Sequence, residues 1–176
     1  RYSDVPLLKS VVTTEYNIEG YPHRSFLDLV LANRPDQCTL VPDGPGVLTS
    51  DQGWDTIGQA AFLKEVVAEL QAANIRVSLF VDAEERFLEG AKEVGAERIE
   101  FYTGHYAQQF SSNPAEAVAP HARCGALANQ IGLGINAGHD LNLENLAYYQ
   151  KNVPDLLEVS IGHALISDAL YFGLQN

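Results

Sequence analysis

The sequence predicts an α/β fold, a (β/α)8 TIM barrel of which six of the eight βα units are visible. Two observations support this prediction. Short runs rich in Val, Ile, Leu, Phe and Tyr alternate with helical patterns, which is the order of βαβ crossovers in a parallel sheet. In addition, each run ends in a polar or glycine-bearing segment, whereas a doubly wound sheet needs such ends only at its switch point.

The six strands are expected where short, nearly continuous apolar runs resemble strands that are buried on both faces. In chain order they are residues 15–19, 37–41, 76–81, 98–102, 132–136 and 157–161.

Helices are expected between the strands, where apolar residues recur at helical spacing and capping residues flank them. An opening helix is expected at about 5–11, and further helices at 23–32 and 57–73. Asp82 is expected to cap the next helix, which Gly95 ends.

Three more helices are expected in the second half of the chain. Asn113 reads as a cap with Pro114 at the first helical position, and Pro120 either kinks this helix or marks its beginning. The last two helices are expected to begin at Asn142 and at about Ala164.

The composition is that of one globular domain, expected over residues 1–176, with 46% hydrophobic residues and a net charge of −12. This charge argues against nucleic acid as a partner, although backbone N–H groups can still bind a small phosphate. No apolar run is long enough for a membrane span, and a cytoplasmic protein is expected. Cys38 and Cys124 are expected to be buried thiols, because two isolated cysteines form neither a disulfide framework nor a zinc site.

Two carboxylates are candidates for chemistry. Glu19 stands at a strand end before Gly20, and taken alone it is more often an ordinary loop carboxylate than a catalytic base. Glu100 lies within the apolar run 99–102, where strand alternation points it into the barrel. A buried carboxylate needs a partner or a purpose, and the scarcity of Lys and Arg favours a functional role for Glu100.

Two histidines follow glycine at neighbouring strand ends, where parallel α/β proteins carry out their chemistry. Gly138 is expected to let the backbone turn sharply and place His139 over the sheet, as an acid–base group or as a support for the loop. Gly162 and His163 open the last helix, whose N–H groups suit a phosphate. A metal site of Glu19, His139 and His163 is a minor alternative, since no HxH or HExxH spacing occurs.

The long loop 43–54, rich in Gly and Pro, is expected to take part in function. Thr49 and Ser50 offer hydroxyl groups to a polar substrate, and Trp54 is expected to anchor the loop. His121 lies in a helical stretch and is expected on the surface.

Six motifs spread along the chain resemble the pyridoxine 5′-phosphate synthase family of vitamin B6 biosynthesis. They are EYNIEG, QCTLVPD, LTSDQGWD, RVSLFVD, INAGHDLNLENL and LEVSIGHALI, in one register along essentially the whole chain. The resemblance implies a cytoplasmic homo-octamer of (β/α)8 barrels that needs no metal or organic cofactor. It also implies condensation of 3-amino-2-oxopropyl phosphate with 1-deoxy-D-xylulose 5-phosphate to pyridoxine 5′-phosphate, phosphate and water.

The same resemblance implies a role for each candidate residue. Glu19 in NIEG resembles the general base, His139 in NAGH the general acid, and Glu100 in RIEFYTG the transition-state stabiliser. Since the family often has glycine where Asp140 stands, a backbone contact to a phosphate is expected there. The other implied substrate contacts are Thr49 for the deoxyxylulose phosphate, and Gly162 and His163 for the aminoketone phosphate.

The family's first strand, with its Asn-x-Asp-His motif, and its second strand, with a catalytic His and nearby Arg residues, have no counterpart here. We therefore expect two βα units before Arg1 and more of the closing helix after Asn176, as the lack of any Met also suggests. Without them the chain alone is expected to be inactive. Two other functions remain open: a metal-dependent sugar-phosphate isomerase or aldolase barrel, and a non-catalytic barrel fragment.

Overall fold

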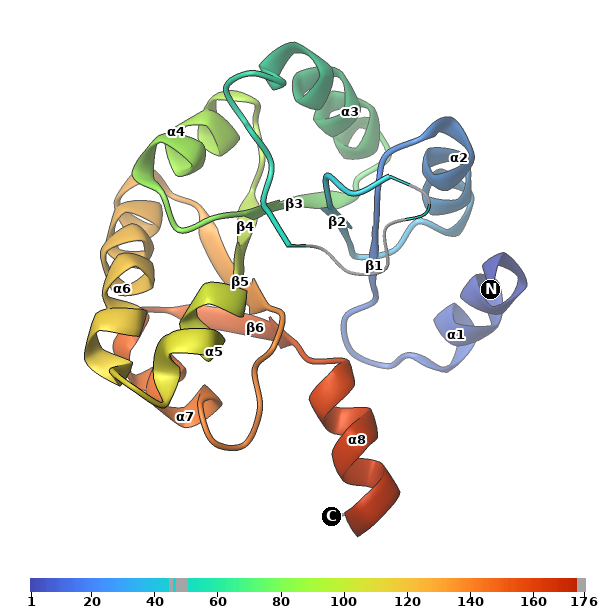
Figure 1. Ribbon diagram of the computed structural model, residues 1–176. Helices are drawn as coiled ribbons and strands as arrows, with labels where there is room; N and C mark the ends of the chain where they lie inside the picture. Colours follow the sequence, from blue (N-terminus) through green and yellow to red (C-terminus); the bar gives the residue numbers. More distant parts are fainter. Residues whose placement is uncertain (45, 47–50, 174–176) are drawn as a thin grey trace.

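Six parallel strands form one curled sheet whose spatial order follows the chain from β1 to β6 (Figure 1). The computed structural model describes residues 1–44, 46 and 51–173. Because every neighbouring pair is parallel, the expected α/β fold is confirmed. The strands are β1 (Asn17–Gly20), β2 (Gln37–Leu40), β3 (Arg76–Val81), β4 (Arg98–Tyr102), β5 (Gly134–Gly138) and β6 (Leu156–Ser160).

The helices surround the outer face of the curled sheet, and the last of them projects away from it (Figure 1). No helix in the described ranges is long and apolar enough to cross a lipid bilayer. After a short 3₁₀ turn at Tyr2–Asp4, the helices are α1 (Val5–Val11), α2 (Arg24–Asn33), α3 (Ala60–Ala72), α4 (Glu85–Glu93), α5 (Gly104–Phe110), α6 (Pro114–Ile131), α7 (Leu146–Asn152) and α8 (His163–Phe172).

Several boundaries differ from the expected ones because local hydrogen bonds hold residues outside the helix or strand. β5 begins at Gly134 and not at Gly132, since Gly132, with φ of 73°, is the left-handed cap of α6. Asp82 does not cap α4, because its carboxylate accepts from the Gly53 N–H at 3.0 Å. α7 begins at Leu146, later than expected, because the Asn142 side chain closes a turn before the helix.

The longest helix, α6, begins at the residue predicted from the Asn113 cap. The Asn113 side chain accepts from the N–H of Glu116 at 3.3 Å, and Pro114 is the first helical residue. Pro120 therefore lies inside α6 and does not mark its beginning. The short helix α5, Gly104–Phe110, was not expected from the sequence.

Alternate residues of each strand point to opposite faces of the sheet. The outer face is apolar and packs with the helices into one core, which also contains the two predicted buried thiols. Trp54 anchors its loop to this core, as expected, by donating its indole N–H to the Leu40 carbonyl at 2.8 Å. The inner face buries the aromatic side chains of Phe80 and Tyr102 near the carboxyl ends of the strands. Its other buried residues are polar, namely Gln37, Thr39, Ser78, Glu100 and Asn136.

A network of paired charges lies at the amino ends of the strands on this inner face. Arg76 forms an ion pair with Glu15 and also donates to the Gln37 side chain at 2.9 Å. Arg98 pairs with Glu158 at 3.1 Å. Mutual pairing offsets part of the cost of burying these charges, although desolvation and the charge of Glu15 still raise the pKa of Glu158. The network forms the floor beneath the strand ends.

The prediction that His121 lies on the surface is wrong. Its side chain is 4% exposed, because this face of α6 packs against the sheet and α7. Nδ1 lies 2.9 Å from the Tyr149 hydroxyl, and the ring meets Phe101 edge to face. Burial lowers the pKa of His121 to about 4, with a smaller contribution from the charge of His105.

This depressed pKa makes part of the stability dependent on pH. An unfolded chain binds a proton at His121 below about pH 6.5, but the folded protein does so only near pH 4, so stability falls as the pH falls between them. We expect a loss of up to about 3 kcal/mol from this group alone. Urea unfolding at pH 7 and pH 4.5 measures it, and His121→Gln should show a smaller acid-induced loss than the wild type. Equal losses in the two proteins would contradict the assignment.

Candidate active site

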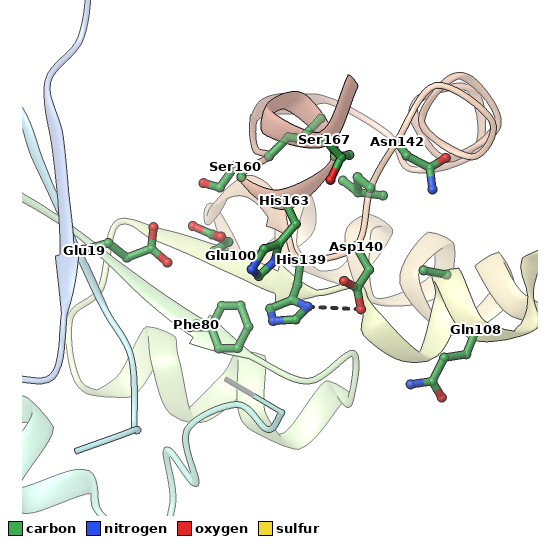
Figure 2. A pocket seen from close by; sticks show the side chains of 15 residues that line it. Glu19, Phe80, Glu100, Gln108, His139, Asp140, Asn142, Ser160, His163 and Ser167 are labelled. Carbon is green, nitrogen blue, oxygen red and sulfur yellow. Dashed lines mark ion pairs between the residues drawn. The ribbon is translucent and has the colours of Figure 1, made fainter. Parts of the chain in front are cut away.

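A cavity of about 910 Å³ opens at the carboxyl ends of the strands (Figure 2). The sequence predicted seven site residues, and Thr49 lies outside the described residues. The other six all line this cavity, although they come from β1, β4 and the segments after β5 and β6. They are Glu19, Glu100, His139, Asp140, Gly162 and His163.

Glu19 reaches the cavity from β1, and in Figure 2 its carboxyl group points toward Glu100. The side chain is exposed at the open side of the cavity, yet the protein around it reduces the hydration of the carboxylate. This desolvation raises the pKa of Glu19, and the negative charge of Glu158 raises it further. A carboxyl group with a raised pKa can exchange protons closer to neutral pH.

Glu100 is the most buried acid of the site, with 1% of its surface exposed. Desolvation raises the pKa of Glu100 well above its ordinary value, and the charges of Glu19 and Glu158 act in the same direction. A hydrogen bond from Ser160 offsets this only in part. The charges that act on Glu100 are those of other carboxylates, Glu19 and Glu158, and its functional role stays a prediction.

Gly138 makes room for Glu100 and does not provide the sharp turn expected of it. A Cβ atom at Gly138 would lie 2.0 Å from Oε1 of Glu100, because the two residues occupy adjacent strands on the same face. The left-handed backbone falls instead on His139 and Asp140, with φ of 87° and 56°. Such conformations are uncommon for non-glycine residues and persist where the surroundings hold them.

His139 sits over the carboxyl end of the sheet, as predicted. Its ring meets Tyr102 edge to face with 5.2 Å between centroids, and Nδ1 lies 3.2 Å from Oδ2 of Asp140 (Figure 2). Protonation of the imidazole would turn this contact into an ion pair. The Asp140 side chain therefore contacts the adjacent imidazole as well as lining the cavity.

Gly162 and His163 lie at the start of α8, and both line the cavity. A Cβ atom at Gly162 would meet nothing within 4 Å, so the space beside this backbone is open to a ligand. No side chain caps this helix end, which leaves the N–H groups of its first turn suited to an anion. The described lining residues include neither Lys nor Arg, so an anion would be bound here by backbone N–H groups, by the imidazoles and by hydroxyl or amide side chains.

Further polar residues of the cavity were not singled out from the sequence. Ser160 is the last residue of β6. Strand alternation places it on the same face as Glu158, two residues earlier, and this pattern could have identified it from the sequence. Gln108 lies on the unexpected helix α5, so no motif pointed to it. Asn142 and Ser167 complete the polar lining.

The described residues contain no group of three His, Cys, Asp or Glu side chains arranged to hold a metal ion. Glu19, His139 and His163 share the cavity without forming such a group.

Solved structures with the same architecture have little sequence in common with this chain. The tryptophan synthase A-subunit from Pyrococcus furiosus has a TM-score of 0.64 at 15% identity, covering 99% of this chain and 66% of that one. A PaMucR phosphodiesterase in complex with c-di-GMP has a TM-score of 0.58 at 12% identity, over 85% of this chain and 63% of that one. These similarities support the barrel-type fold and carry no information on activity.

Sequence relatives are much closer. Proteins named pyridoxine 5′-phosphate synthase from Flavobacterium johnsoniae and Christiangramia forsetii are each 54% identical, over all of this chain and 74% of their own length. One of the same name from Bacteroides thetaiotaomicron is 51% identical over the same shares. The family model described as pyridoxal phosphate biosynthesis protein PdxJ matches residues 1–176. With a match over its whole length and relatives at this identity, the chain belongs to the PdxJ family.

Proposed function

We propose that this cavity condenses 3-amino-2-oxopropyl phosphate with 1-deoxy-D-xylulose 5-phosphate, giving pyridoxine 5′-phosphate, inorganic phosphate and water. The observation that carries the proposal is the convergence of Glu19, Glu100 and His139 from separate strands on one cavity. Imine formation, elimination and ring closure each move protons, and these three groups can do so without a metal or an organic cofactor. The names of the close relatives support the same reaction.

The three acid–base groups differ in their surroundings, and this supports different roles. Glu19 is exposed at the cavity with a raised pKa, and we assign it the role of general base. His139 is assigned as the general acid. Glu100 is buried with a strongly raised pKa, so it can carry a proton and donate a hydrogen bond where negative charge develops in the transition state.

Phosphate recognition is assigned to the start of α8. Gly162 leaves open space beside its backbone, and the following N–H groups and the His163 side chain can bind an anion. Asp140 would repel a phosphate through its carboxylate, so the contact assigned to it is made by the backbone. Thr49 keeps its assignment as a contact to the deoxyxylulose phosphate.

We also propose that the protein acts in the cytoplasm as a self-associating barrel, a homo-octamer. The support is the apolar surface of α8, whose exposed residues include Leu165, Ile166, Leu170, Tyr171 and Phe172. Light scattering of the purified complete protein should give the mass of eight chains. A monomeric mass across the micromolar range would overturn this part of the proposal.

Activity is tested with the complete protein and both substrates, by following pyridoxine 5′-phosphate and released phosphate together. We expect Glu19→Gln and His139→Asn each to lower kcat by about 10²- to 10⁴-fold, the usual contribution of one acid–base group. The exposed helical residue Glu65 offers a matched control, and Glu65→Gln should retain wild-type turnover. Wild-type turnover in either site variant would remove that residue from the mechanism. A requirement for a stoichiometric divalent ion would favour the metal-dependent alternative.

The raised pKa of Glu100 gives a separate prediction for stability. The folded protein holds the Glu100 proton above pH 4.5, where an unfolded chain releases it, so this carboxyl group costs stability increasingly as the pH rises. Glu100→Gln keeps a neutral side chain of the same shape at every pH. In urea unfolding we expect this variant to gain stability relative to the wild type as the pH rises above 4.5, while losing turnover. Parallel stability curves would show that Glu100 is ionised in the folded protein.

A further inference from the structure

Thr103 joins the end of β4 to the turn that carries His139. Its side chain is fully buried, directly before α5. The hydroxyl lies 2.7 Å from the Gly138 carbonyl oxygen and also within hydrogen-bond reach of the His139 carbonyl oxygen. The Thr103 N–H donates to the same Gly138 carbonyl at 3.0 Å. One residue thus holds the carbonyl group of the last residue of β5 and the next carbonyl group along the chain.

The next carbonyl along the chain is held from a different direction. The Asn145 side-chain amide donates to the Asp140 carbonyl oxygen at 3.1 Å, and its own carbonyl oxygen accepts from the Asn142 N–H at 2.9 Å. Asn145 is 3% exposed, so both ends of the turn are fixed by buried polar side chains. Between these two attachments lie His139 and Asp140, both in the left-handed region.

A left-handed turn at a non-glycine residue needs this kind of support, because an unsupported chain prefers other conformations. The direction of the His139 ring depends on the peptide planes on either side of its Cα atom. Those planes carry the Gly138 and His139 carbonyl groups, which are the two groups that the Thr103 hydroxyl contacts. The hydroxyl therefore acts on the orientation of the imidazole without touching the cavity, since Thr103 is not among its lining residues.

We propose that Thr103 is a positioning residue for His139, and that its hydroxyl holds the imidazole in the direction needed for proton transfer. This inference rests on the proposed function, in which His139 is the general acid. A displacement of about 1 Å at a reacting group can cost on the order of a hundredfold in rate, so one buried hydrogen bond at this place is enough to affect turnover.

The test replaces only the hydroxyl group. In the complete protein, Thr103→Val keeps the shape of the side chain and the backbone N–H bond to Gly138. We expect kcat to fall by about tenfold to a hundredfold, with KM for both substrates within about twofold of wild type. The pH dependence of kcat should also change on the limb that His139→Asn abolishes. A merely structural role would lower the melting temperature and leave kcat, KM and the pH profile unchanged.

Thr56 provides a matched control elsewhere in the fold. It too is fully buried, and its hydroxyl donates to a backbone carbonyl, that of Phe87, at 2.9 Å. Thr56→Val should therefore lose comparable stability and keep wild-type kcat and the wild-type pH profile. An equal fall of kcat in Thr56→Val would overturn the inference, because the effect would then follow from stability alone.

A pair of smaller substitutions keeps the test decisive if Thr103→Val does not fold. Thr103→Ser and Thr103→Ala both lack the methyl group and differ only in the hydroxyl, so we expect the serine variant to be the faster by about tenfold. Equal rates in this pair would overturn the positioning role. Failure of the proposed function would give a different result from failure of this inference. The wild-type protein would then form no pyridoxine 5′-phosphate, or His139→Asn would turn over normally.

Discussion

The alternation of side chains along six parallel strands is the constraint on which the rest of this structure depends. On the outer face it supplies a continuous apolar surface for the helices, and on the inner face it gathers polar and charged groups in layers. The lower layer contains Arg76, Arg98 and Glu158, and the ion pairs Arg76–Glu15 and Arg98–Glu158 balance the charges there. The upper layer contains Glu19 and Glu100, for which the described structure shows no cationic partner of this kind. The charges that pair with one another therefore lie at the amino ends of the strands, and the acids available for chemistry lie at the carboxyl ends of the same inner face.

Glu158 connects these two layers electrostatically. It is bonded to Arg98 in the floor, yet its negative charge still raises the pKa of Glu19 and Glu100 above it. Under the proposed function this matters for substrate binding, because an acidic protein has to accept two phosphorylated compounds. Carboxyl groups that hold protons more readily repel those phosphates less, and the same protons are then available for the reaction.

Much of this arrangement was predictable from the sequence because it depends on local patterns. β3, β4 and α1 have the bounds that their apolar patterns predict, and the strand-end residues meet in one cavity because parallel strands place their carboxyl ends together. Burial against distant segments was not predictable. The helical pattern around His121 does not reveal which face the core covers, and nothing in a linear motif connects Thr103 with the Gly138 carbonyl. Thr49 remains an expectation.

The close approach of Gly138 to Glu100 makes the direction of the buried acid depend on the neighbouring strand. A side chain at position 138 would meet the far end of the flexible Glu100 side chain, so the carboxyl group would have to rotate away from its present place. A substitution there would therefore act first on where the acid points, and the backbone of either strand would be affected less.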